Sequence, residues 1–378
     1  MAKKKQEDKP GKMSIESIRS AINKSAGEEV AFDLANANPT NVIQWIPTGS
    51  RWLDSIICNG NLAGIPVGKI SEIAGLESTG KSFLAAQAAA NAQKMGIDVV
   101  YFDSESAISS DFMEKAGIDL EKLIYLQASS VEFVLETIED LLKLPNQWLF
   151  IWDSLALTPS LKDIEGDFNP QSTIAVKPRI LAKGFAKLIL PLANAQATLL
   201  ILNQLKTNIT MSVSEAMTTP YITPGGKAAI YSYSLRIWLT RRKAKASFVI
   251  NDKGYTVGTE VKAKIEKSRF GTQRRVCNFK ILWGDDVGVQ DEESWLDAVK
   301  SSKHIISGGA WYTMTYEDGS TEKFQASGWI DKLKIPKFRT RVIDIMDEEL
   351  IVNFKNQAQS AASYYDKEET TKEENAES

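Results

Sequence analysis

The sequence has few cysteines and no long apolar segment. Cys58 and Cys277 lie far apart and without CxxC spacing, which argues against a disulfide framework and against a zinc site. No segment approaches the roughly 18 consecutive apolar residues of a membrane span. The basic start, residues 1–6, is not followed by the apolar core of a secretory signal. We therefore expect a cytoplasmic protein without a membrane partner.

The net charge is also low, but it is unevenly distributed. The whole chain carries −3, whereas residues 236–275 hold twelve lysines and arginines against three acids, a net charge of +9. Residues 366–378 carry six acids and two lysines, a net charge of −4, with almost nothing apolar. Such a segment cannot bury enough surface to fold, so we expect an acidic, disordered tail. A low total therefore does not exclude nucleic acid as a partner of the basic segment.

Short β-rich apolar segments alternate with helical ones in the first half of the chain. Three of these segments, within residues 97–203, end at the polar residues Asp103, Asp153 and Asn203. Segments that are apolar on both faces predict a mainly parallel sheet with helices on both faces. Ligands of such sheets bind at the carboxyl ends of the strands, so these polar residues mark a candidate site.

The second half of the chain has a different pattern. Residues 234–283 are rich in strand-forming residues and contain a Lys253-Gly254 turn, which predicts an antiparallel extension of the sheet. Residues 289–358 look like a small α+β domain. Near the other end, residues 14–22 have the pattern of a short helix.

A glycine-rich motif joins a strand to a helix. Residues 75–82 fit GxxxxGK[ST], follow the strand-like residues 67–74 and open an alanine-rich segment. Successive N–H groups of such a loop wrap phosphates, its lysine neutralises the β and γ oxygens, and its hydroxyl holds Mg²⁺. The helix amino terminus adds positive potential there. The motif predicts a site for ATP and Mg²⁺ formed by Gly75, Glu77, Ser78, Thr79, Gly80, Lys81 and Ser82.

Two carboxylates complete the chemistry that this motif needs. Asp153 ends an apolar strand, as the carboxylate that holds Mg²⁺ through water does in P-loop enzymes. Glu105 follows the strand that ends at Asp103, where a general base can take a proton from the attacking water. An exposed loop acid without a role is the alternative for Glu105.

Several short motifs together resemble a known family. They are Glu77 within the P-loop, Phe102–Glu105, Trp152–Pro159, Ile201–Gln204 and Gly225–Ala228. In order and spacing they resemble the bacterial RecA family of DNA strand-exchange recombinases. The likeness extends from about Pro47 to Tyr312. The stretch Glu266–Arg269 is similar to the divergent phage-encoded, UvsX-like branch, so the host can be a bacterium or a virus that infects one.

The resemblance implies a fold and a function. It implies an N-terminal helix and linker in residues 1–46, a RecA-like P-loop ATPase core in 47–284, a small α+β domain in 285–358 and a tail in 359–378. The implied protein is an ATP-dependent DNA recombinase. It forms a helical filament on single-stranded DNA and exchanges strands with double-stranded DNA in recombination and repair, with single-strand-binding and loader proteins as candidate partners.

The resemblance also assigns roles within the nucleotide site. Glu105 is implied to activate water, and Gln204 to sense the γ-phosphate and pass its state to a DNA-binding loop. Phe112 lies where the family places an aromatic against adenine, although a core aromatic of a short helix has the same appearance. Lys267 and Arg269 align with two lysines that reach the γ-phosphate on the neighbouring subunit; a solvated basic face is the alternative.

The resemblance also places Tyr231, which follows the glycine pair Gly225-Gly226, at the subunit interface, where it is implied to link contact with the neighbouring subunit to the position of the loop.

Two long segments, residues 161–174 and 205–226, interrupt the α/β pattern. Loops of such length in a compact domain are functional or disordered, and the resemblance makes them the two DNA-binding loops of the family. Cations bind phosphates, hydroxyls and amides add further contacts, and apolar side chains separate base steps. The candidate DNA contacts are Arg179, Lys206, Thr207, Asn208, Ile209, Thr210, Met211, Gly225 and Gly226.

Two other functions use related sequences. A hexameric helicase or mediator ATPase has the same core, because fold alone does not set function. The Gly225-Gly226 region and the C-terminal domain favour a recombinase instead. A non-hydrolysing DNA scaffold is disfavoured because Lys81, Glu105 and Gln204 are all present.

Overall fold

The computed structural model divides the chain into two units. It describes residues 13–36, 38–106, 108–166, 175–210, 212–241, 247–283 and 287–352. The first unit, residues 1–43, contains helix α1 (Ile15–Ala26), which begins after the N-cap Ser14 and ends at Gly27 in the left-handed region. The second unit, residues 44–378, contains all other elements. The predicted acidic tail, residues 359–378, lies outside the described residues.

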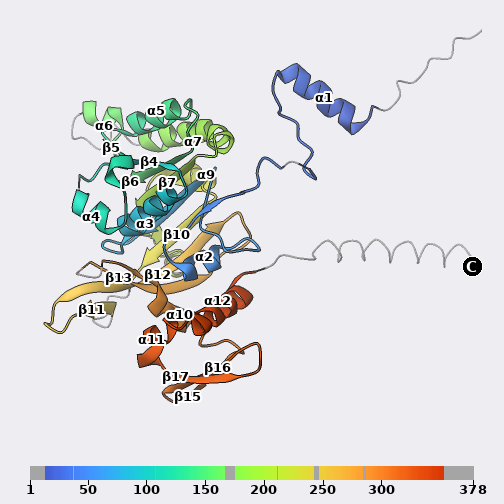
Figure 1. Cartoon of the computed structure of the whole chain (residues 1–378). Helices are drawn as coiled ribbons and strands as arrows, with labels where there is room; N and C mark the ends of the chain where they lie inside the picture. The colour runs from blue at the N-terminus through green and yellow to red at the C-terminus, as the bar shows by residue number, and fades with distance from the viewer. Residues whose placement is uncertain are drawn as a thin grey trace, which may run out of the picture. The chain divides into compact units, whose positions relative to one another are not determined.

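A ten-stranded sheet forms the centre of the second unit (Figure 1). Its order is β14-β13-β12-β10-β3-β7-β6-β4-β5, with β11 paired to β12. Strands from β10 to β5 run parallel, and those from β10 to β14 run antiparallel. The strands are β3 (Ile70–Gly75), β4 (Asp98–Asp103), β5 (Leu123–Gln127), β6 (Trp148–Asp153), β7 (Thr198–Gln204), β10 (Leu235–Thr240), β11 (Phe248–Ile250), β12 (Thr256–Ser268), β13 (Val276–Leu282) and β14 (Gly288–Gln290).

Helices cover both faces of this sheet. Because side chains alternate along a strand, Tyr101 packs on one face with the helix α3 (Lys81–Lys94), and Phe102 packs on the other. The second face is covered by α5 (Val131–Leu141) and α7 (Val176–Asn194). The α/β fold with a mainly parallel sheet, helices on both faces and an antiparallel extension is therefore confirmed.

A small α+β region follows the sheet in sequence. A three-stranded antiparallel sheet is packed against three helices, and rings of Phe324, Trp329 and Phe338 meet between them. The Arg51 guanidinium binds both carboxylate oxygens of Asp347 at 2.7 and 2.8 Å, which joins this region to the core. The elements are α10 (Asp291–Val299), β15 (Ile305–Gly308), β16 (Trp311–Thr315), β17 (Thr321–Gln325), a 3₁₀ turn (Ala326–Gly328), α11 (Trp329–Leu333) and α12 (Pro336–Leu350).

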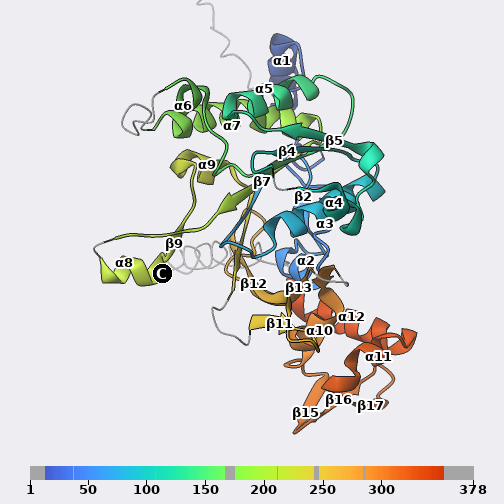
Figure 2. The same cartoon turned by 90° about the vertical axis from the view of Figure 1, so that its left-hand side faces the viewer.

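The two segments predicted as loops contain short regular elements. Residues 205–226, called the second loop below, form an arm in which two short antiparallel strands carry a helix at the tip (Figure 2). Residues 161–165 form a helical turn, and 167–174 lie outside the described residues. The remaining elements are β1 (Trp45–Ile46), α2 (Arg51–Ile57), β2 (Ile65–Pro66), α4 (Ser110–Lys115), a 3₁₀ turn (Leu120–Lys122), α6 (Leu161–Glu165), β8 (Lys206–Thr207), α8 (Val213–Thr218), β9 (Tyr221–Ile222) and α9 (Gly226–Ser232).

Among the residues described, no helix combines the length and the apolar character that crossing a bilayer requires.

Candidate active site

The glycine-rich motif forms a tight turn between β3 and α3. A Cβ added to Gly80, which has φ 77°, would lie 2.3 Å from Ile281 Cδ1, and one added to Gly75 would lie 2.4 Å from Thr79 Oγ1. The positive φ of Gly80 therefore favours glycine there, and at Gly75 a side chain would displace Thr79, which is buried. The first N–H groups of a helix have no acceptor within it, so the start of α3 can bind an anion.

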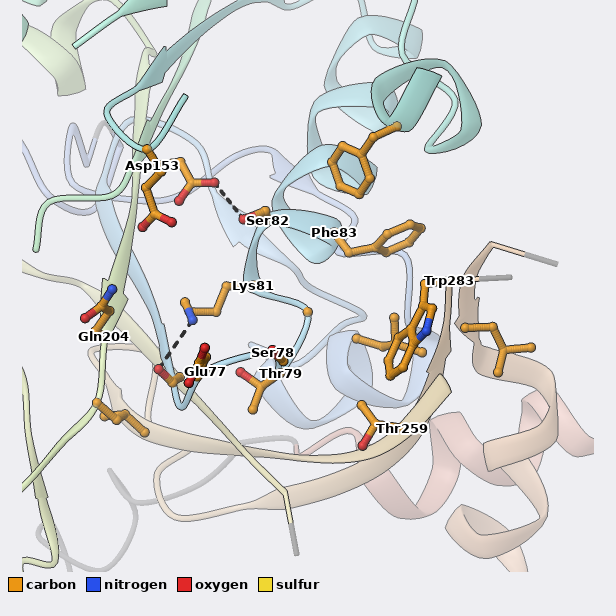
Figure 3. Close-up of a pocket in the computed structure, with 17 residues that line it drawn as sticks. Glu77, Ser78, Thr79, Lys81, Ser82, Phe83, Asp153, Gln204, Thr259 and Trp283 are labelled. Atoms are coloured by element: carbon orange, nitrogen blue, oxygen red, sulfur yellow. Dashed lines mark hydrogen bonds between the residues drawn. The ribbon is translucent and has the colours of Figure 1, made fainter. Parts of the chain in front are cut away.

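A cavity of about 740 Å³ opens beside this turn, at the carboxyl end of the parallel strands (Figure 3). The predicted nucleotide-binding residues all line it, together with Glu105, Phe112 and Gln204. The complete lining is Gly75, Glu77, Ser78, Thr79, Gly80, Lys81, Ser82, Phe83, Glu105, Phe112, Asp153, Gln204, Leu205, Thr259, Ile281, Leu282 and Trp283. Residues from six separate parts of the chain thus meet here.

Lys81, Ser82 and Asp153 form the charged centre of the cavity. Lys81 Nζ donates to the carbonyl oxygens of Gly75 and Leu76, at 3.4 and 3.1 Å. Ser82 Oγ donates to Asp153 Oδ2 at 2.7 Å, and burial raises the pKa of this carboxyl. Burial lowers the pKa of Lys81, whereas the nearby carboxylates, Asp153 first, raise it. The Ser82 hydroxyl and the Asp153 carboxylate are therefore in direct contact, close to the Lys81 ammonium.

Glu105 lies next to this centre and has a fixed position. Ser154 Oγ donates to Glu105 Oε1 at 2.7 Å, and the Glu105 backbone N–H donates to Asp103 Oδ1 at 2.8 Å. Asp103 is itself bound by the hydroxyl of Tyr125 at 2.8 Å. The residues that follow β4 and β6 are therefore hydrogen-bonded to one another beside the cavity.

Aromatic side chains form the far wall of the cavity. Phe112 meets Phe83 edge to face, with ring centroids 5.7 Å apart, and Trp283 lines the same wall with 48% of its surface exposed. Sequence reasoning missed Phe83, Trp283 and Thr259. The latter two reach the cavity only through the pairing of β12 with β13, and no motif or spacing signals that pairing.

Lys267 and Arg269 do not line the cavity of their own chain. Lys267 Nζ donates to the carbonyl oxygens of Ile230 and Tyr231 at 2.8 and 3.2 Å, and Arg269 Nη2 donates to that of Tyr231 at 2.7 Å. The two cations thus share one face at the end of α9. Burial, and next the charge of Arg269, lowers the pKa of Lys267 to about 8.

The candidate DNA contacts before the arm and at its start are mostly exposed. Arg179, Lys206 and Thr207 are exposed, and Ile209 is 96% exposed. The backbone and the side chain of Asn208 donate to carbonyls at the far side of the arm.

Further along the arm, Thr210 Oγ1 donates to Glu215 Oε2 at 2.8 Å, and Met211 lies outside the described residues.

The glycine pair at the end of the second loop lies against residues on either side of the first predicted loop, residues 161–174. Gly225 and Gly226 have φ 109° and 80°. A Cβ at Gly225 would lie 3.3 Å from Leu155, which follows β6, and one at Gly226 would lie 3.2 Å from Pro178 of α7. The bases of the two predicted loops therefore meet.

The basic segment 236–275 is not one continuous charged surface. Arg236 is buried and forms an ion pair with Glu72, and Lys264 pairs with Glu266 at 2.7 Å. Arg236 therefore lies in the core, whereas Lys262 and Lys264, at alternate positions of β12, lie on its less buried face. Arg242, Lys243 and Lys245 lie outside the described residues.

Comparison with known proteins gives the family. Residues 13–288 match the model of the RecA N-terminal domain. Protein RecA of Streptomyces avermitilis is 28% identical over 300 residues, covering 79% of this chain and 75% of that protein. Protein RecA of Bifidobacterium breve is 29% identical over 306 residues (81% and 74%), and that of Saccharopolyspora erythraea is 30% identical over 271 residues (72% and 74%). The chain therefore belongs to the RecA family of DNA-dependent ATPases, which bind DNA as filaments and exchange strands in recombination and repair.

Proposed function

We propose that the cavity binds ATP with Mg²⁺ and that Lys81, Glu105 and Gln204 act on the γ-phosphate. The observation that carries this proposal is the meeting of the P-loop lysine with Ser82, Asp153 and Glu105 in one cavity. Lys81 and the N–H groups at the start of α3 offset the phosphate charge.

The donors beside Lys81 fit Mg²⁺. Ser82 Oγ and Asp153 Oδ2 are both hard oxygen donors and are 2.7 Å apart. Mg²⁺ prefers oxygen ligands, keeps several waters and uses substrate phosphates. Among the described residues, no group of three or more His, Cys, Asp or Glu side chains could hold a metal alone. When bound, Mg²⁺ neutralises charge on the transferred phosphoryl group.

Glu105 is the proposed general base. The Ser154 hydroxyl bound to Oε1 orients the carboxylate, which then takes a proton from the attacking water. Gln204 ends β7, lines the cavity and directly precedes the arm, so it is suited to sense phosphate. Phe112 and Trp283 supply flat apolar surface on which an adenine ring can stack.

The arm and the residues near Arg179 are the proposed DNA-binding surface. Lys206 and Arg179 offer phosphate contacts, and the exposed side chain of Ile209 can enter between bases. Such contacts are independent of sequence, which suits strand exchange because base pairing supplies the specificity there.

Hydrolysis is proposed to require a neighbouring subunit. Lys267 and Arg269 are not among the residues that line their own cavity, and Tyr231, whose carbonyl oxygen they bind, is 68% exposed. In a filament this basic pair would face the γ-phosphate held by the next subunit. A cation supplied in trans contributes about 10³–10⁵ in rate.

The finer biological assignments are proposals as well. We place the protein in the cytoplasm of a bacterium, or of the host if it is phage-encoded, with single-strand-binding and loader proteins as partners. The sequence Glu266–Arg269, in which an arginine lies two residues after Lys267, supports the phage-encoded branch.

The direct test is ATP turnover by the full-length protein with and without single-stranded DNA, in Mg²⁺ or in a chelator. We expect turnover to require Mg²⁺ and to rise when DNA is added. Equal turnover with and without DNA would contradict the proposal.

A further inference from the structure

An ion pair is buried within the sheet, away from the cavity. Glu72 of β3 and Arg236 of β10 are opposite one another in the register of these parallel strands. Arg236 Nε donates to Glu72 Oε2 at 2.6 Å, and their side chains are 6% and 0% exposed, respectively. Burying two charges costs about as much free energy as their attraction returns, so such a pair is weak evidence for a role in stability. The other hydrogen bonds of Glu72 and Arg236 show which parts of the chain the ion pair positions.

Those bonds lead to both ends of the second loop. Asn203 Nδ2 donates to Glu72 Oε1 at 2.9 Å and to the carbonyl oxygen of Pro224 at 3.0 Å. Arg236 Nη2 donates to Thr223 Oγ1 at 2.9 Å. Asn203 lies just before the arm, and Thr223 and Pro224 close it. One buried pair therefore fixes the start and the end of the same loop.

The pair also lies between the two parts of the proposed γ-phosphate site. On one side, Asn203 Oδ1 accepts from the backbone N–H of Gln204, which lines the cavity. On the other side, Arg236 is opposite Lys267 in the register of β10 and β12. A movement at Gln204 or Lys267 would therefore act on residues that are directly joined to the side chains binding the ends of the loop.

We propose that Glu72, Arg236 and Thr223 are positioning residues that couple the nucleotide state to the DNA affinity of the second loop. The inference rests on the proposed function of the cavity and arm. The binding of two ligands is coupled when both ligands shift the equilibrium between two conformations of the same structural element. Here that element is the second loop. The Arg236–Thr223 hydrogen bond that closes it lies outside both the cavity lining and the candidate DNA contacts.

The test compares Thr223→Val with Thr223→Ser in the full-length protein. Valine has nearly the volume of threonine but lacks the hydroxyl, whereas serine keeps it. The measurement is the affinity for a fluorescent single-stranded oligonucleotide with a non-hydrolysable ATP analogue, divided by the affinity with ADP. We expect this ratio to fall about tenfold in Thr223→Val, as loss of one hydrogen bond to a charged group does, and to be kept in Thr223→Ser.

Two further variants keep the outcome clear. Thr137→Val removes an exposed hydroxyl that bonds only within α5, so the ratio should not change. The double variant Glu72→Met, Arg236→Met replaces the pair by apolar side chains of similar size, a change that folding often tolerates. In this variant the ratio should fall to about one, because nucleotide would no longer alter the affinity for DNA. Affinity for ADP without DNA checks that each variant retains the pocket.

A wild-type ratio in Thr223→Val or in the double variant would overturn the inference, as would equal loss in Thr223→Val and Thr223→Ser. If the wild-type protein has no nucleotide-dependent DNA affinity, the proposed function of the cavity and arm fails instead.

Discussion

At the scale of single residues, the groups proposed to hold the nucleotide come from a different element than the group proposed to act on it. Lys81 and Ser82 begin α3 beside the phosphate-binding turn, whereas Glu105 approaches from the end of β4 and is oriented by Ser154. Substitutions in the two groups should therefore have different effects.

Lys81→Ala should abolish ATP binding because the P-loop loses its charge. Glu105→Gln should retain binding but lower turnover by about 10²–10⁴, the usual effect of losing a general base. Equilibrium binding of a fluorescent ATP analogue and steady-state hydrolysis measure the two effects. Near-normal hydrolysis by Glu105→Gln would remove this residue from its proposed role.

Lys267 gives a pH dependence with a definite sign. Its pKa of about 8 means that it loses its charge as pH rises through this value, and a nearby phosphate would move the loss upward. DNA-stimulated hydrolysis should therefore fall with rising pH at or above pH 8. In Lys267→Arg the fall should vanish because a guanidinium stays charged; a pH profile with the same falling limb in both proteins would argue against the role of Lys267.

Which residues could be predicted depended on how local their signals were. The P-loop and the strand ends at Asp103 and Asp153 were found because motif and strand end lie next to each other in sequence. Trp283 was missed, since only the pairing of distant strands brings it to the cavity. Arg236 was counted only as part of the basic segment 236–275, because its buried partner Glu72 is 164 residues away in sequence.

At the scale of elements, the arm combines exposed apolar and charged side chains that should contribute differently to DNA binding. Lys206→Ala should weaken binding and reduce its salt dependence by about one phosphate contact. Ile209→Ala should weaken binding without altering the salt dependence, because no charge is lost.

The measurement is the affinity for single-stranded DNA over a series of salt concentrations. Thermal unfolding serves as the control, because substitutions at such exposed positions change stability by no more than about 0.5 kcal/mol. Wild-type affinity in Ile209→Ala would exclude the apolar contact.

Elements with strong periodicity were predictable, and those within the loops were not. The central parallel strands are buried on both faces, and α3 is buried along one complete face, so their apolar patterns are clear. The helix α8 and the strands β8 and β9 bury almost nothing, so their composition resembles that of a loop. Their positions are fixed by hydrogen bonds across the arm and at its base.

At the scale of the whole molecule, the proposed trans-acting role of Lys267 and Arg269 requires assembly for hydrolysis. Arg269→Ala should leave nucleotide binding by the free subunit nearly intact and should remove DNA-stimulated hydrolysis, since a trans-acting cation contributes about 10³–10⁵ in rate.

Mixing Arg269→Ala with Lys81→Ala protein should restore part of the hydrolysis. A mixed filament contains interfaces at which an intact P-loop faces an intact basic pair. Turnover of the mixture on single-stranded DNA is compared with that of each variant alone. If the mixture stays inactive although both proteins assemble on the same DNA, the trans-acting role is wrong.

Formation of joint DNA molecules tests the central claim most directly. The full-length protein is incubated with a labelled single-stranded oligonucleotide, a supercoiled duplex, ATP and Mg²⁺. Strand exchange in a nucleotide-dependent filament requires joint molecules with a homologous duplex, none with a heterologous duplex, and none with Lys81→Ala protein. ATP hydrolysis without any joint molecules, or unwinding of DNA in their place, would contradict a recombinase.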